Sequence, residues 1–154
     1  MLVDLLQDEH IIRNVHVPNW EAAIRCSGEL LVKTECVEPQ YVDQMIAISK
    51  EAGPYIVIVP GVALAHARPT DGVNHLGLSL ATLNEPVAFG NADNDPVRVV
   101  ISLAALDSSG HLNALRDLVR FVSVPQNIDN LCQCKSNEEV RELIRQFEDA
   151  AANR

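Results

Sequence analysis

The chain has 154 residues, a length typical of one domain, and its 12 basic and 21 acidic side chains give a net charge of −9 with histidine neutral. Hydrophobic residues make up 47% and aromatic residues only 4%, which indicates a globular protein with an aliphatic core. The negative charge argues against nucleic acid and acidic membrane surfaces as partners. No apolar stretch approaches the roughly 20 residues that span a bilayer, and residues 1–10 carry acids where a signal peptide is basic, so a cytoplasmic protein without membrane insertion is expected.

The first third of the chain predicts a short helix, a strand and two longer helices. Residues 1–10 are read as the short helix, and the β-branched side chains of residues 11–17 favour the strand. Asn19 is a suitable N-cap for a helix over residues 20–33. A further helix is expected over residues 39–52, because this segment opens with proline, has one apolar face and is followed by glycine.

Three segments in the middle of the chain predict further strands. Residues 55–59 form a continuous apolar run between a Gly-Pro and a Pro-Gly pair, which is typical of a strand buried on both faces. Residues 60–69 are then expected to form a loop. Alternating leucines in residues 75–83 and β-branched side chains in residues 97–103 predict two more strands.

Two amphipathic helices are expected in the last third. Apolar side chains have helical spacing in residues 111–122, and a capping box at Ser136 and Glu139 opens a final helix. Helices and strands thus interleave irregularly along the chain. This order predicts an α/β fold with a mixed β-sheet of about five strands flanked by helices, in a single domain over residues 1–154.

The sequence offers no local sign of a metal or cofactor. A chain of this size folds without disulfides, and its four cysteines lack the spacing of a zinc site, so structural thiols are expected. Templates for nucleotide binding, zinc proteolysis and serine hydrolysis are missing as well. We therefore predict no metal site and no cofactor. The cysteines are Cys26, Cys36, Cys132 and Cys134.

His66 is a candidate nucleophile because of its surroundings. It lies in a segment of small, mostly apolar residues that follows the expected buried strand, where a bulky partner can approach and a poorly hydrated ring keeps a neutral nitrogen. Arg68, two residues later, offers a planar donor fork for a phosphoryl or carboxylate oxygen. The alternatives are a structural His66 and an Arg68 that only pairs with Asp71 or Glu85 at the surface.

His111 is the second candidate, between the end of an expected strand and the start of an expected helix. Free amides and the positive end of a helix dipole favour anions at such a place. The alternative is a structural role in the first turn of the helix, with neighbouring serines as competing caps. The other three histidines have no reactive neighbour in the sequence and are expected to be structural; they are His10, His16 and His75.

Several motifs resemble one known family. GPYIVIVPGVALAHARP (residues 53–69) is similar to the active-site signature of enzyme IIA proteins of the mannitol/fructose class of the sugar phosphotransferase system (PTS), with the ascorbate-specific enzyme IIA as its nearest form. The resemblance extends through VEPQY (37–41), NDPV (94–97) and AALDSSGH (104–111), and so over nearly the whole chain.

This resemblance implies a phosphocarrier, and hence a phosphotransferase component of the PTS sugar-uptake system. His66 would accept a phosphoryl group from the carrier HPr and pass it to a cysteine of an enzyme IIB partner, which serves the enzyme IIC permease. His111 matches the second active-site histidine, which would hydrogen-bond the phosphoryl group. The branch implies ascorbate or a related sugar acid or pentitol. It also implies a mixed sheet flanked by helices.

The chain departs from the family pattern at two positions. Ala65 stands where the family usually has proline before the reactive histidine, and residues 49–51 lack the arginine of the mannitol branch. Arg68 is placed to supply this charge to the phosphoryl group. Two other functions remain open: an enzyme IIA-like regulatory module that binds a protein target, and a small metal-dependent hydrolase that uses both histidines.

Overall fold

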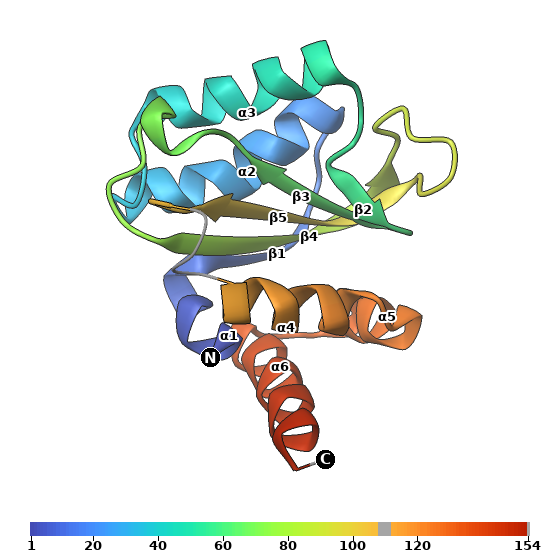
Figure 1. The fold of residues 1–154 in the computed structure, drawn as a ribbon. Coiled ribbons are helices and arrows are strands. Elements are labelled where there is room, and N and C mark those ends of the chain that lie inside the picture. The colour runs from blue at the N-terminus through green and yellow to red at the C-terminus, as the bar shows by residue number, and fades with distance from the viewer. Residues whose placement is uncertain (108–111, 154) are drawn as a thin grey trace.

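A five-stranded mixed sheet separates two layers of helices (Figure 1). The computed structural model describes residues 1–107 and 112–153. The strand order is β1-β4-β5-β3-β2, with parallel pairs β1/β4 and β3/β5 and antiparallel pairs β4/β5 and β2/β3. The predicted fold class is therefore confirmed. The strands are β1 (Ile11–Val15), β2 (Val57–Val59), β3 (Val62–His66), β4 (Gly77–Val87) and β5 (Val97–Ala104).

Two helices, α2 (Trp20–Lys33) and α3 (Pro39–Ala52), cover one face of the sheet, and both end where the sequence predicts. The Asn19 side chain accepts a hydrogen bond from Ala22 N, as an N-cap does. Gly28 lets the two helices approach closely, because a Cβ there would lie 2.9 Å from Val42 Cγ2. Aliphatic side chains of both helices bury this face of the sheet.

The other face is covered by α1, α4, α5 and α6 (Figure 1). Ser136 caps α6, as the sequence predicts, by accepting from Glu139 N. The buried Glu148 carboxylate, near the end of α6, accepts from Leu2 N and Val3 N at 2.9 Å each, and so fixes the N-terminal segment. These helices are α1 (Leu2–Leu5), α4 (Leu112–Val122), α5 (Pro125–Gln133) and α6 (Asn137–Ala152), while η1 (Asp8–His10) and η2 (Pro69–Asp71) are 3₁₀ turns. In the described part of the chain, no helix combines the length and apolar character needed to cross a membrane.

The structure corrects the prediction for residues 55–69. The expected buried strand is only the short edge strand β2, which begins after an exposed Tyr55, and the expected loop contains the buried strand β3. Pro60 and Gly61 form the turn of a hairpin, since Gly61 has a φ of +82°. Small residues in β3 reflect tight packing between two helical layers, whereas the sequence suggested an open loop.

Helix α5 was not expected. Its nine residues are mostly polar, and only Ile128 and Leu131 are buried, so its apolar pattern is too short to be distinctive.

Candidate functional site

His66 is the last residue of β3, at the edge where β3 and β5 both end. In the parallel register His66 lies beside Leu103, and β5 ends one residue later at Ala104. Carboxyl ends of neighbouring parallel strands commonly form ligand sites. The His66 side chain is exposed, so the expectation of a poorly hydrated ring is wrong.

The His66 ring is oriented by its own strand. Its Nδ1 lies 3.0 Å from the carbonyl oxygen of Leu64. A carbonyl oxygen only accepts, so Nδ1 carries the proton and Nε2 holds the lone pair in the neutral ring. This tautomer leaves the Nε2 lone pair available.

His111 lies outside the described residues. Strand β5 ends at Ala104, before this segment, and helix α4 begins at Leu112, directly after His111 in the sequence. The chain therefore passes the carboxyl end of β5, next to His66, shortly before His111. A meeting of the two rings stays a prediction.

Arg68 follows His66 closely and is held by Asp71. Oδ2 of Asp71 accepts from the backbone N of Arg68 at 3.0 Å and from its Nε at 3.3 Å, so Arg68 does pair with Asp71, while its role at the site stays a prediction. The pair does not use the two terminal Nη nitrogens of Arg68. The Arg68 side chain is 73% exposed.

A buried tyrosine hydroxyl hydrogen-bonds to the backbone next to His66. Tyr41, in the first turn of α3, donates to Leu103 O at 2.6 Å and accepts from Ala67 N at 3.0 Å. Burial raises the pKa of Tyr41, an effect that the bond from Ala67 N partly offsets, so its hydroxyl is protonated at neutral pH. No local sequence pattern indicates this contact, because its partners lie 26 and 62 positions away from the tyrosine.

Apolar side chains lie exposed near the same edge. Leu106, two residues after β5, is 58% exposed, and Leu112, at the start of α4, is 52% exposed. The two leucines offer apolar contact area for another protein at this end of the sheet.

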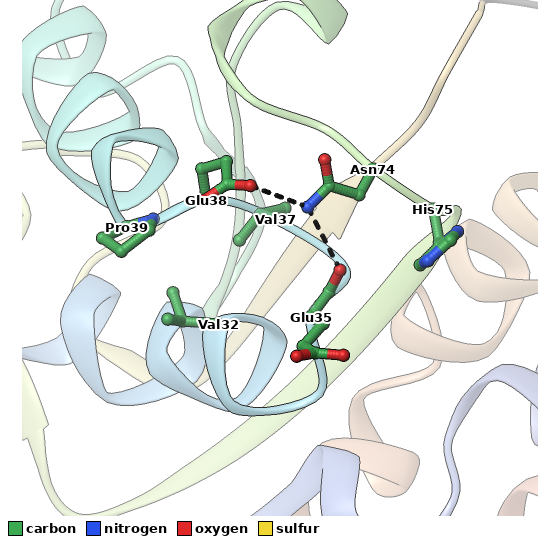
Figure 2. A pocket seen from close by; sticks show the side chains of 7 residues that line it. All are labelled: Val32, Glu35, Val37, Glu38, Pro39, Asn74 and His75. Carbon is green, nitrogen blue, oxygen red and sulfur yellow. Dashed lines mark hydrogen bonds between the residues drawn. The ribbon is translucent and has the colours of Figure 1, made fainter.

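A depression of about 310 Å³ opens at the same end of the sheet, between the α2–α3 connection and the segment before β4 (Figure 2). The Asn74 amide donates to Glu35 O and to a carboxylate oxygen of Glu38. His75 also lines it, whereas His66 does not. The exposed His66 ring is thus not part of this depression.

Of the remaining predicted residues, His10 and the cysteines have structural surroundings, whereas His16 and His75 are exposed. His10 hydrogen-bonds through both ring nitrogens, to Leu5 O and Thr34 Oγ1. Burial raises the pKa of the Cys26, Cys132 and Cys134 thiols, which keeps them protonated. Among the described residues no cluster of potential ligands could hold a metal ion.

Comparisons with known proteins agree with this architecture. Residues 4–147 match the family model described as phosphoenolpyruvate-dependent sugar phosphotransferase system, EIIA 2. The ascorbate-specific PTS system EIIA component of Escherichia coli K12 is 35% identical over 148 residues, which are 96% of each chain.

Solved structures have the same fold. The crystal structure of a putative PTS IIA domain from Streptococcus pyogenes M1 GAS has a TM-score of 0.86 and 33% identity, and covers 97% of this chain and 98% of that chain. Enzyme IIA in its complex with phosphorylated enzyme IIB of the Escherichia coli mannitol system has a TM-score of 0.79 and 29% identity, with 92% and 99% covered. The chain therefore belongs to the EIIA 2 family and is a phosphotransferase component of a PTS sugar-transport system.

Proposed function

We propose that this chain is a phosphocarrier in which His66 receives a phosphoryl group from phosphorylated HPr and passes it to a cysteine of an enzyme IIB. The observation that carries the proposal is the His66 ring, which is exposed at the end of β3 with Nδ1 bonded to Leu64 O. This leaves Nε2 as the reactive nitrogen. Such a relay would work in the cytoplasm, with residues 1–154 as one enzyme IIA domain.

The chemistry is two in-line displacements at phosphorus. In the first, the Nε2 lone pair attacks, the Nε2–P bond forms, and the N–P bond of the donor phosphohistidine breaks with its electron pair returning to the donor ring. In the second, a partner thiolate attacks, the S–P bond forms and the Nε2–P bond breaks, which restores neutral His66. Neither step consumes water or needs a redox partner.

Two further groups stabilise the transferred phosphoryl group in this proposal. His111 donates a hydrogen bond to a phosphoryl oxygen, as the family resemblance implies. The exposed Nη nitrogens of Arg68 supply positive charge next to the developing negative charge, which supports transfer without a metal.

The open surface around His66 suits protein partners. The relative solved with phosphorylated enzyme IIB supports an enzyme IIB as acceptor, and Leu106 and Leu112 supply apolar contact area. The name of the 35% identical relative supports ascorbate, or a related sugar acid or pentitol, as the sugar that an enzyme IIC permease carries in this system.

The test is a reconstituted relay. Phosphoenolpyruvate, enzyme I and HPr are incubated with the chain, and intact mass is measured before and after mild acid. One acid-labile phosphoryl group is expected on the natural protein and none on His66→Ala. His75→Ala is the matched control, because His75 is also an exposed histidine at this end of the sheet. A phosphoryl group that survives on His66→Ala contradicts the proposal.

The second step separates transport from a purely regulatory role. Phosphorylated protein is mixed with the enzyme IIB of an ascorbate system, and the label is followed to the acceptor cysteine. Transfer supports the relay. A protein that is phosphorylated on His66 but never passes the group on would instead fit the regulatory module.

A further inference from the structure

The hydroxyl of Tyr41 lies between the ends of the two strands that meet beside His66. The tyrosine is 1% exposed and reaches the site from α3, on one face of the sheet. Its hydroxyl donates to Leu103 O at 2.6 Å and accepts from Ala67 N at 3.0 Å. Both contacts involve direct neighbours of His66, one in the chain and one across the register.

In the hydrogen-bond pattern of the sheet, the Tyr41 hydroxyl takes the place of a direct bond between the ends of β3 and β5. Val99 N donates to Gly61 O at 3.0 Å, at the start of the β3/β5 pair, and the register then runs without a shift to His66 beside Leu103. Donors alternate between the strands of a parallel pair. Continued to the end, this alternation makes Ala67 N and Leu103 O the last donor and acceptor, and the tyrosine hydroxyl lies between them.

We propose that Tyr41 is a positioning residue for the phosphoryl transfer, which it assists by fixing the strand ends on both sides of His66. The inference rests on the proposed function of His66. The hydroxyl completes the hydrogen bonding of two partly buried backbone groups, Ala67 N and Leu103 O, and so links the ends of β3 and β5 where His66 emerges. It thereby sets the direction in which the His66 ring leaves the sheet.

The positioning role of the Tyr41 hydroxyl can be separated from the packing role of the Tyr41 ring. The ring of Tyr41 fills core volume among α3 and the sheet, and a phenylalanine ring would fill the same volume. It is the hydroxyl of Tyr41 that hydrogen-bonds to the backbone flanking His66. Because a small misplacement of a reacting group costs a large factor in rate, loss of this contact alone is expected to slow transfer.

The kinetic test compares Tyr41→Phe with the natural protein in the reconstituted relay. We expect kcat for phosphorylation of His66 to fall about 10- to 100-fold, with little change in KM for phosphorylated HPr, because the exposed surface is unchanged. Ser49→Ala is the matched control, since Ser49 is also on α3 and its nearly buried hydroxyl donates to Met45 O, away from His66. An unchanged kcat in Tyr41→Phe, or an equal fall in Ser49→Ala, overturns the proposal.

A second readout needs no partner protein and so remains valid if the relay itself fails. The ¹⁵N shifts of the His66 ring are expected to show one tautomer, protonated on Nδ1, in the natural protein and in Ser49→Ala. In Tyr41→Phe they are expected to move toward the average of two exchanging tautomers. Unchanged shifts overturn the proposal. A natural protein that shows these shifts but accepts no phosphoryl group contradicts the proposed function alone.

A third measurement covers the case in which Tyr41→Phe does not fold. The amide of Ala67 follows the end of β3 and is expected to exchange with solvent at least about 100-fold more slowly in the natural protein than in an unfolded chain, because it donates to a buried hydroxyl. Exchange of the Ala67 amide at the rate of an unfolded chain overturns the proposed link through the Tyr41 hydroxyl.

Discussion

Nδ1 of His66 lies 3.0 Å from the carbonyl oxygen of Leu64, two residues earlier in the same strand. This hydrogen bond occupies Nδ1 and leaves the lone pair of Nε2 available. In the proposed function, the reacting atom of His66 is therefore Nε2. Strand β3 thus determines both the position of the His66 ring and which of its nitrogens is available.

The first prediction concerns the atom that is phosphorylated. We expect the phosphoryl group on Nε2 of His66, because Nδ1 donates to Leu64 O. Phosphorus coupling to the ring nitrogens in ¹⁵N-labelled protein distinguishes the two positions. Coupling through Nδ1 would contradict the orientation described here and would require the ring to leave Leu64.

The second prediction concerns Arg68. Arg68→Ala is expected to lower the rate of phosphoryl acceptance about 10- to 100-fold, because a charged donor next to the transferred group is lost. Arg68→Lys is expected to restore only part of the rate, since it lacks the planar fork. Arg25→Ala is the control, because Arg25 is also a largely exposed arginine paired with an aspartate, Asp43, on the α2–α3 layer. Normal rates in Arg68→Ala would show that its pair with Asp71 is its whole role.

The third prediction concerns the exposed leucines near His66. Leu106→Asp is expected to raise KM for phosphorylated HPr about 10-fold, because it places a charge where the partner buries apolar surface. Stability is expected to change by less than about 0.5 kcal/mol. Val124→Asp is the control: this residue is 42% exposed but lies beyond the far end of α4. Equal effects in the two variants would mean that net charge alone is responsible.

Much of this arrangement was predictable because the signals are local. Caps at Asn19 and Ser136 set helix starts correctly, since a cap depends on residues within one turn. The hairpin of β2 and β3 was not predicted, because residues 56–65 carry no polar side chain and only the turn at Gly61 divides them. The hydroxyl bridge of Tyr41 depends on the register of two distant strands, which no local pattern contains.

The fourth prediction concerns the buried carboxyl of Glu148. Burial, with a smaller contribution from nearby Asp117, raises the pKa of Glu148, while its bonds from Leu2 N and Val3 N act in the opposite direction. A carboxyl group whose pKa is raised on folding binds its proton more tightly in the folded state. Its contribution to stability is therefore complete below the ordinary pKa of glutamate and is lost as the pH rises through the raised value.

Glu148→Gln removes this titration. The stability of the natural protein relative to the variant is expected to fall as the pH rises through that window. Urea unfolding of both proteins at several pH values measures the difference. Glu148→Ala is expected to cost about 2 kcal/mol because two buried amides lose their acceptor. A difference between natural protein and Gln variant that does not depend on pH would exclude the raised pKa.

The fifth prediction concerns the contact of α2 with α3, the helix that carries Tyr41. A Cβ at Gly28 would lie 2.9 Å from Val42 Cγ2, so Gly28→Ala forces the helices apart. The resulting strain of about 1–3 kcal/mol exceeds the gain of about 1 kcal/mol in helix propensity. Because Val42 neighbours Tyr41, the displacement is also expected to weaken the contact of the hydroxyl with Ala67 N and to speed exchange of that amide.

Val42→Ala removes the clashing methyl groups, so the double variant is expected to be more stable than the sum of the two single changes by about 1 kcal/mol or more. Additive changes in the free energy of unfolding would show that the helices absorb the methyl group without moving α3.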